Sequence, residues 1–362
     1  MISERNNEPA RKSGTRPVIG VLPGEGVGPE VIGSAIRVLE ALQAATGRTL
    51  DISVDGRASL PDGADPSGEV IDFCQRVFAQ GGSILAGPYG GRVVYELRRR
   101  FDLYYKLNPL RPPPELKGAA RLRSEHLHEV DIMVVREGTE GVYQGGWQES
   151  LSDTGERRAD HWFSYSERAA RRILQQAALI AQERTGRLAV VVKRSGVPTI
   201  SQLWSDVAQK VAAEAGIECS IMDVDYAAYF LIQHPDQLDV MAAPNLFGDI
   251  LSDIGGVLLG SRALSFSGNF SDNGATIFQT NHGAAHDLAG QDRANPGGQI
   301  LAAAMLLRRG LGLEKEASMV EAALARVWSQ GWRTFDLPEP ECRIAGTREF
   351  GERVAGAVQA LG

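Results

Sequence analysis

The side chains best suited to chemistry lie in residues 245–253 (NLFGDILSD) of this 362-residue chain. Asp249 and Asp253 are four residues apart, so on a helix both carboxylates project from the same face. The largely apolar run 238–243 before them predicts a buried strand, which places the pair where open α/β sheets bind their ligands. Two carboxylates held in this way suit a hard divalent cation such as Mg²⁺ or Mn²⁺. An acidic face in solvent is the alternative that this spacing also allows.

Three more charged side chains follow predicted strands. Arg136 comes after a strand at 131–135, Lys193 after one at 188–192, and Asp225 after one at 217–222. Predicted strands and helices alternate, which indicates a largely parallel sheet. Because such a sheet gathers the carboxyl ends of its strands at one edge, we expect these residues and Asp249 near one site.

Composition narrows the class of protein. Apolar residues make up 43% and charged residues 23%, as in soluble globular proteins, and the length suggests two domains. The net charge of −7 argues against general nucleic-acid binding. Three scattered cysteines indicate neither a disulfide framework nor a zinc site, and no run is long enough to span a membrane. The polar residues 1–14 predict a disordered tail without a signal sequence, so a cytoplasmic enzyme fits best.

Local patterns add several expectations. The glycines of residues 24–28 resemble a dinucleotide fingerprint but miss its spacing, so a tight strand-to-helix turn is an equal alternative. Among the consecutive arginines 98–100, at most two can face one pocket. Ile250, Leu251 and Ile254 would pack the helix of Asp249 against a core. The proline-rich residues 108–114 predict a crossing between domains, and residues 144–166 an arm or hairpin whose tryptophans need partners.

Taken together, these motifs resemble the decarboxylating β-hydroxyacid dehydrogenases, the family of isocitrate, isopropylmalate and homoisocitrate dehydrogenases. The resemblance runs from residue 18 to about 350, and its most specific parts are residues 22–30, 245–253 and 282–295. It implies an α/β, isopropylmalate dehydrogenase-like fold that is not a Rossmann fold, with a large, mostly parallel sheet shared by two domains. We expect a cofactor-side domain at 15–103 and 260–362, and a substrate and dimerisation domain at 104–259 that carries the arm.

The resemblance also implies the reaction, an NAD-dependent oxidation of a CH–OH group with decarboxylation, which requires Mg²⁺ or Mn²⁺. Asp225, Asp249 and Asp253 would bind the metal ion, and Tyr143, Lys193 and Asp225 would be catalytic. Lys193 would accept the hydroxyl proton, and Tyr143 would return a proton to carbon. Both Lys193 and Asp225 would come from the second subunit of a homodimer with shared active sites.

Binding residues follow from the same resemblance. Arg98 and Arg136 would bind the carboxylates of a malate-like substrate, because forked donors suit planar anions. Asp287 would face the ribose hydroxyls of the cofactor and repel a 2′-phosphate, which favours NAD over NADP. The adenine part of NAD would contact four further positions: His282, Gly283, Ala285 and Asn295. Without the resemblance, a lone histidine such as His282 is more often structural.

The chain departs from the family pattern in the substrate pocket. Relatives carry Asp-Leu-Tyr-Ala-Asn-(Leu or Val)-Arg-Pro, whereas residues 102–109 read Asp-Leu-Tyr-Tyr-Lys-Leu-Asn-Pro. Asn108 therefore replaces a third carboxylate-binding arginine. In the segment that reads the variable group of the substrate, Arg92 would meet a distal anion and Tyr95 would bound a bulkier substituent. The cofactor motif departs as well, since Gln279 stands in place of a glutamate.

From these departures we expect a 3-substituted malate other than isopropylmalate, with a distal anion like that of homoisocitrate or phosphonomethylmalate, used in a specialised biosynthetic pathway. The alternatives are isopropylmalate, isocitrate or tartrate as the substrate. A non-catalytic regulatory subunit is a further alternative, because some eukaryotic relatives lose the same arginine. Retention of Tyr143, Lys193 and the three metal-binding aspartates favours an enzyme.

Overall fold

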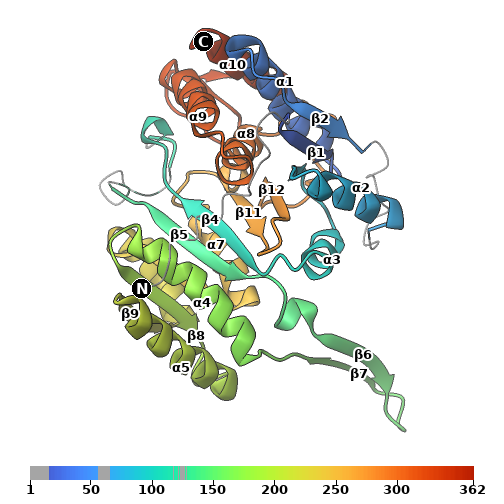
Figure 1. Ribbon diagram of the computed structural model, residues 1–362, viewed down its shortest axis with the longest axis vertical. Coiled ribbons are helices and arrows are strands. Elements are labelled where there is room, and N and C mark those ends of the chain that lie inside the picture. The colour runs from blue at the N-terminus through green and yellow to red at the C-terminus, as the bar shows by residue number, and fades with distance from the viewer. Residues whose placement is uncertain (1–15, 56–65, 117, 121, 123–126, 128) are drawn as a thin grey trace. The chain divides into compact units, whose positions relative to one another are not determined.

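The computed structural model describes residues 16–55, 66–116, 118–120, 122, 127 and 129–362, so the predicted tail at residues 1–14 lies outside the described part (Figure 1). The chain divides into two units. Unit 1 consists of residues 1–93 with 266–362, and unit 2 of residues 94–265.

Unit 1 contains five strands in the order β2-β1-β3-β12-β11. All neighbours are parallel except β11, which is antiparallel to β12. Buried apolar runs such as β1 and β3 are typical of parallel strands that are covered on both faces. The strands are β1 (Val18–Leu22), β2 (Asp51–Val54), β3 (Ser83–Ala86), β11 (Phe266–Phe270) and β12 (Thr276–Thr280).

The helices of unit 1 begin and end at recognisable signals. Ser67 caps α2 by accepting a hydrogen bond from the backbone N–H of Val70 at 3.4 Å, and Gly47 ends α1 in the left-handed conformation. The helices are α1 (Gly28–Thr46), α2 (Gly68–Ala79), α8 (Gly297–Met305), α9 (Glu314–Ser329) and α10 (Thr347–Gln359). A π-helical turn (Leu306–Gly310) follows α8, and the short strands β13 (Trp332–Arg333) and β14 (Arg343–Ile344) pair in parallel.

Unit 2 has a second five-stranded arrangement, in the order β4-β5-β10-β8-β9. Only β4 is antiparallel to its neighbour β5. The strands are β4 (Tyr105–Leu110), β5 (Ile132–Glu137), β8 (Arg187–Val192), β9 (Glu218–Asp223) and β10 (Val240–Ala243). The predicted α/β class with mostly parallel strands is thus confirmed in both units.

Helices cover both faces of this second sheet. In Figure 1, α4 and α5 lie on one face and α7 lies on the other. The helices are α3 (Val93–Arg100), α4 (Glu167–Gln182), α5 (Pro198–Ala215), α6 (Val224–Gln233) and α7 (Asn245–Gly255). Short 3₁₀ turns connect these elements at Pro114–Leu116, Val142–Gln144, Pro235–Gln237 and Arg262–Leu264.

Helix α7 lies unusually close to β4 and β5. A Cβ atom on Gly248 would lie 2.7 Å from the side chain of Arg136, and one on Gly255 would lie 2.4 Å from Leu110. Leu251 is buried as predicted, but Ile250 is 46% exposed, so its predicted place in the core was wrong. The reason is that glycines, rather than large apolar residues, form the contact face of this helix.

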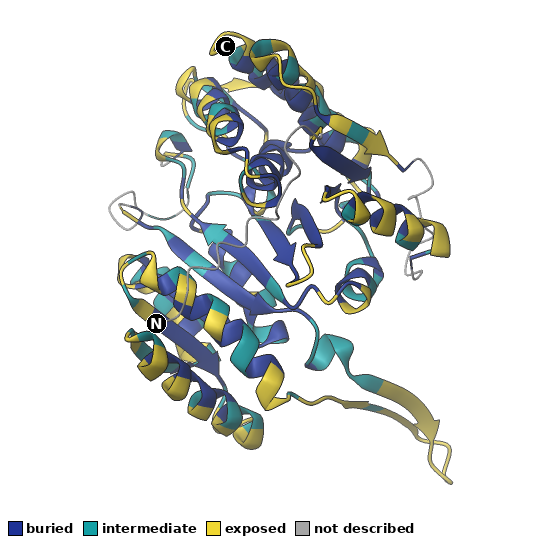
Figure 2. Cartoon of the chain, in the orientation of Figure 1, coloured by how far each residue is buried: buried dark blue, intermediate teal, exposed yellow. Residues whose placement is uncertain are grey.

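A hairpin extends from unit 2 within the segment that we expected to form an arm. Strands β6 (Gly146–Leu151) and β7 (Arg157–Trp162) pair in antiparallel fashion. Figure 2 shows that almost the whole hairpin is exposed, and Trp147 and Trp162 are 54% and 55% exposed. More than half of the surface of each tryptophan is thus open to solvent.

None of the helices in the described part of the chain combines the length and the apolar character that a bilayer crossing requires.

Candidate active site

The buried centre of the site is the contact between Arg136 of β5 and Asp249 of α7. Nη1 of Arg136 donates to Oδ1 of Asp249, while its Nε and Nη2 donate to Oδ1 of Asn245 at 3.1 and 2.9 Å. Asn245 is itself fixed, because its Nδ2 donates to the carbonyl oxygen of Glu140 at 3.1 Å and its backbone N–H to Oη of Tyr165 at 2.8 Å. Neighbouring strands β5 and β10 therefore deliver a guanidinium and a carboxylate to one point.

Tyr143 makes the third contact at this centre. Its Oη donates to Oδ2 of Asp249 at 2.7 Å. Gly141 lies two residues before Tyr143 and has a φ of 81°, a conformation that favours glycine. A side chain at this position would also collide with Tyr165. Burial and then the hydrogen bond to Asp249 raise the pKa of Tyr143 above its ordinary value, so the phenol keeps its proton and can donate it.

Asp249 and Asp253 lie one turn apart on α7, as their spacing predicted. Arg262 pairs with Asp253, with 2.6 Å between Nη2 and Oδ2. Burial by itself would raise the pKa of Asp249, but the charges of Arg136 and Lys106 outweigh burial and lower that pKa below its usual value. Asp249 is therefore an anion, and the two carboxylates fit a hard divalent cation as oxygen donors. These two residues would hold the Mg²⁺ or Mn²⁺ ion.

The other two predicted residues form a separate pair. Lys193 follows β8 and pairs with Asp225 in the first turn of α6, with 2.8 Å between Nζ and Oδ1. In the described part of the chain, no three His, Cys, Asp or Glu residues lie close enough to hold a metal ion, so Asp225 does not join Asp249 and Asp253 within one chain. We expected these residues to lie near one site with Arg136 and Asp249. Within one chain they instead form two separate pairs at the ends of neighbouring strands.

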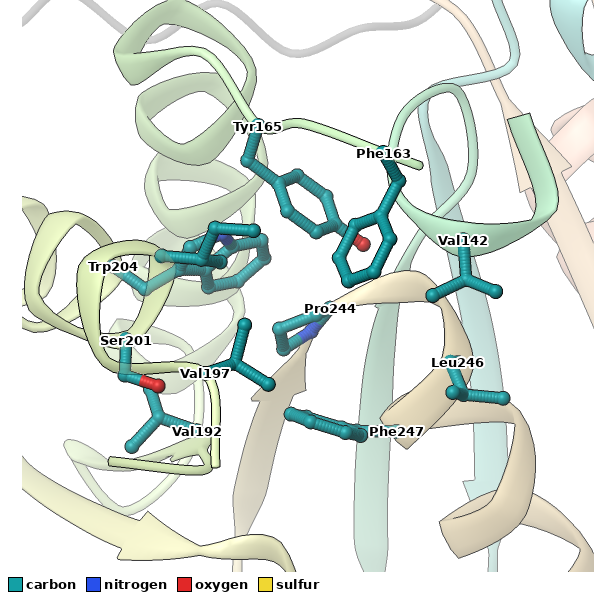
Figure 3. Close-up of a pocket in the computed structure, with 11 residues that line it drawn as sticks. Val142, Phe163, Tyr165, Val192, Val197, Ser201, Trp204, Pro244, Leu246 and Phe247 are labelled. Carbon is teal, nitrogen blue, oxygen red and sulfur yellow. The ribbon is translucent and has the colours of Figure 1, made fainter. Parts of the chain in front are cut away.

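A cavity lined by apolar side chains borders both pairs. A cavity of about 250 Å³ is lined by residues adjacent in sequence to both pairs, including Val192 beside Lys193 and Val142 beside Tyr143. Figure 3 shows Phe247 and Pro244, which follow β10, facing the aromatic residues of the cavity. The remaining lining residues are Phe163, Tyr165, Val197, Ile200, Ser201, Trp204 and Leu246.

Only one of the three consecutive arginines turns inward. Arg98 is 3% exposed, whereas Arg99 and Arg100 are exposed. The guanidinium carbon of Arg98 lies 5.5 Å from the ring centroid of Tyr95. Burial and the nearby charge of Arg136 lower the pKa of Arg98 to about 10. Arg98 is thus a desolvated cation close to Arg136, as a binding site for carboxylates requires.

Strand β4 contributes two buried polar residues beneath α7. Asn108 is fully buried, and neither Nδ2 nor Oδ1 has a hydrogen-bond partner among the described residues. Lys106 is 3% exposed and lies directly opposite Arg136 in the strand register. Lys106 was not among the residues predicted from the sequence, and neither was Arg262. For Lys106 the available signal was a lysine inside a run of otherwise buried residues, but the prolines at 109 and 112–114 hid the strand.

The predicted cofactor residues lie in unit 1. The N–H of Val27 donates to the carbonyl oxygen of Ala284 at 2.8 Å, and a Cβ atom on Gly26 would lie 2.0 Å from the same oxygen. The glycine turn of residues 24–28 therefore packs against the loop that carries His282, Gly283, Ala285 and Asp287. Asp287 is exposed, and Ala285 has a φ of 45°. This loop presents backbone and an exposed carboxylate, as expected for a surface that binds NAD.

Two other predicted binding residues of unit 1, Asn295 and Arg92, lie outside this loop. Asn295 is buried, where its Oδ1 accepts from the N–H of Gly297 at 2.8 Å and its Nδ2 donates to Asp336 at 3.0 Å. Asn295 therefore shapes the start of α8 through bonds that are already made. Arg92 is half-buried and belongs to unit 1, whereas Tyr95 belongs to unit 2 with Arg98 and Arg136.

Comparison with known proteins identifies the family of this chain. The pattern of the family described as isocitrate/isopropylmalate dehydrogenase matches residues 18–354. The chain is 36% identical over 351 residues to the 3-isopropylmalate dehydrogenase of Synechococcus sp. (strain CC9605), which covers 93% of this chain and 98% of that protein. It is 35% identical to the enzyme of the same name from Carboxydothermus hydrogenoformans, with 92% and 93% covered.

A solved structure agrees. The crystal structure of isocitrate dehydrogenase from Methylococcus capsulatus superposes with a TM-score of 0.83 at 26% identity, covering 95% of this chain and 99% of that one. The family match spans nearly the whole chain. The chain therefore belongs to the isocitrate/isopropylmalate dehydrogenase family, as a dehydrogenase that acts on a CH–OH group with the cofactors of that family, NAD and Mg²⁺ or Mn²⁺.

Proposed function

We propose that this enzyme oxidises and decarboxylates a 3-substituted malate other than isopropylmalate, and that the products are a 2-oxo acid, CO₂ and NADH. The observation that carries the proposal is the half-buried contact of Asp249 with both Arg136 and Tyr143. It brings together a carboxylate for a metal ion, a cation for a substrate carboxylate and a phenol that holds its proton. Arg98 adds a second desolvated cation beside them.

Each residue would have a definite task. Arg98 and Arg136 bind and orient the carboxylates of the substrate. Lys193 accepts the proton of the hydroxyl group as hydride leaves for NAD, and Tyr143 gives a proton to the carbon from which CO₂ departs. The divalent ion, held by Asp249, Asp253 and Asp225, would supply positive charge where the substrate oxygen becomes negative.

Substrate preference rests on the pocket rather than on the reaction. The curated relatives named above are 3-isopropylmalate dehydrogenases. In this chain a buried amide, Asn108, takes a position that carries a forked cation in the family pattern, so the donor geometry offered to the substrate differs. Tyr95 packs against Tyr143, with 4.9 Å between ring centroids, and would bound the substituent at carbon 3. Arg92 would meet a distal anion on that substituent.

Two copies of the chain would share their active sites in the cytoplasm. Asp225 is exposed and Lys193 is half-buried, and Asp225 neighbours Tyr226 and Tyr229, which are 53% and 60% exposed. On α7, Ile250 also faces outward beside Asp249. Exposed apolar groups flanking both charged pairs support burial against a second copy, which would bring Lys193 and Asp225 to the Asp249 of its partner.

The test is a panel of acids assayed with NAD and Mn²⁺, in which NADH formation and CO₂ release are both measured. The panel contains isopropylmalate, isocitrate, homoisocitrate, phosphonomethylmalate, malate and tartrate. We expect an acid with a distal anion to give the highest kcat/KM, since the guanidinium group of Arg92 would pair with that anion. If isopropylmalate is clearly the best substrate, the proposed preference is wrong. If the purified chain turns over none of them, a non-catalytic subunit becomes the better reading.

A further inference from the structure

The face of the sheet beneath α7 holds a cation that the proposed function leaves without a task. Along β4, alternate residues share a face, so Lys106, Asn108 and Leu110 point the same way. Leu110 lies against Gly255 of α7, and Lys106 lies opposite Arg136, which lies against Gly248 of the same helix. Lys106 and Asn108 therefore lie under the helix that carries Asp249 and Asp253.

Lys106 is buried without a hydrogen-bond partner or an ion pair among the described residues. Its exposed fraction is only 3%. Burial, followed by the charges of Arg98 and Arg136, lowers the pKa of Lys106, while Asp249 and Asp253 oppose that change. The ammonium group thus lies among the same charged residues that form the active site. A buried cation in this state is unfavourable until an anion joins it.

Asn108, two residues along the same strand, also lacks hydrogen-bond partners for its side chain. It is 0% exposed, and both polar atoms of its amide lack partners among the described residues. Buried amides are almost always hydrogen-bonded, so an unused donor and acceptor here point to a partner that the described residues do not supply. Compared with the family pattern, the cation and the amide have exchanged places two residues apart on one face of the strand.

We propose that Lys106 and Asn108 together bind a carboxylate of the substrate, with the charge supplied by Lys106 and a second donor by Nδ2 of Asn108. This inference rests on the proposed function, since it assigns a further binding residue to the same site. An arginine presents two donors on one rigid fork, whereas a lysine is a point charge on a flexible stem. Two donors on separate side chains would fit a carboxylate whose position or tilt differs from that in the relatives.

The test compares Lys106→Met with Lys210→Met, which removes an exposed lysine on α5. Binding of each enantiomer of malate to the full chain, with Mg²⁺ present, is measured by calorimetry, and thermal unfolding is measured without ligand. We expect Lys106→Met to bind the preferred enantiomer about 10- to 100-fold more weakly. We also expect its Tm to be equal or higher, because a buried charge is lost. Lys210→Met should bind as the wild type does.

A binding role for Lys106 predicts that Lys106→Met binds malate more weakly without a loss of Tm, and a structural role predicts the reverse. A structural role for Lys106 would lower the Tm of Lys106→Met and leave malate affinity unchanged in the folded fraction, and this result would overturn the inference. Equal affinity of Lys106→Met and wild type, or no malate binding by either, would also overturn it. An exchange variant, Lys106→Asn with Asn108→Arg, should recover binding relative to Lys106→Asn alone, because the cation returns to the same face.

Because these readouts need no turnover, they are independent of the substrate panel. If malate binds through Lys106 but no acid is oxidised, the proposed function fails and the binding inference stands. If an acid is oxidised with equal KM and kcat by wild type and Lys106→Met, the inference fails and the proposed function stands.

Discussion

The two charged pairs of unit 2 differ in how far a single chain completes them. Arg136 is 1% exposed, and its contact with Asp249 is reinforced by Asn245 and Tyr143. In the other pair, Asp225 has 69% of its side chain exposed and Lys193 has 30%. Both pairs follow neighbouring strands, yet the first is anchored by a buried arginine, with 34% of the Asp249 side chain exposed, whereas the second has no buried member. A charged residue that follows a strand is therefore not fixed in an active site by that position alone.

The difference also has energetic consequences. A buried pair is strongly destabilised when one partner is removed, because the remaining charge is left without compensation. An exposed pair contributes little to folding. Changes at the first pair should therefore affect activity and stability together, whereas changes at the second should affect activity alone.

The largest effect is expected at the buried pair. Asp249→Asn removes a metal-binding charge, so kcat/KM should fall on the order of 10³-fold or more while the chain still folds. Its stability should also fall by roughly 1–3 kcal/mol, since buried Arg136 loses its counter-ion. Kinetics and urea unfolding measure the two effects. Near-normal turnover would contradict the role given to Asp249.

A smaller loss is expected at the exposed pair, and in activity alone. Lys193→Met removes the proton acceptor and should lower kcat on the order of 10²- to 10³-fold. The Tm should not change, because Lys193 is partly exposed and bonded only to an exposed carboxylate. Lys210→Met is the control for loss of a lysine. A large fall in Tm for Lys193→Met would show that the exposed pair is structural and would remove the contrast.

The buried region should also make the stability of the protein depend on pH. Glu137 follows Arg136 at the end of β5, and burial, opposed by hydrogen bonds from Thr139 and Glu140, raises its pKa from 4.5 to about 7. Its contribution to stability is full below pH 4.5 and is lost as the pH rises towards 7, since the unfolded state releases the proton first. The loss amounts to roughly 3 kcal/mol.

Glu137→Gln cannot ionise, so the unfolding free energy of the wild type relative to this variant should decrease between pH 4.5 and 7. Urea unfolding at both pH values measures the difference. A difference that does not change with pH would mean that Glu137 ionises normally in the folded protein.

The smallest effect concerns substrate choice. Asn108→Arg restores the forked cation of the family pattern, and should shift the ratio of kcat/KM values toward isopropylmalate by about tenfold. The substrate panel measures this ratio for both proteins. If the profile does not change, Asn108 does not determine specificity.

Much of the fold could be predicted because apolar strands and amphipathic helices alternate clearly along the chain. Strand β4 was missed, since Pro109 and the prolines after it are typical of connections, whereas the structure accommodates Pro109 within an antiparallel strand. Helix α6 was not predicted either. The exposed side of α7 was misjudged because its buried face is made by Gly248 and Gly255, which carry no apolar side chain to read.

The site could be predicted only as far as residue types and strand ends allow. Arg136 and Asp249 meet because β5 and β10 are neighbours, and this order follows from tertiary packing rather than from any local pattern. The separation of Lys193 and Asp225 from them was not predictable, since it follows from the order of the strands in the sheet, β5-β10-β8-β9. Lys106 was not predicted because Pro109 and the prolines after it hid the strand that buries this lysine.

Mixing two inactive variants is the most direct test of the claim that the buried pair of one chain works with the exposed pair of another. Asp249→Asn and Lys193→Met chains are unfolded together, refolded, and assayed with the best acid of the panel. If sites are shared, random pairing gives dimers with one intact site, and activity should return to about a quarter of the wild-type value. Activity no greater than that of the two variants refolded separately would contradict a shared site.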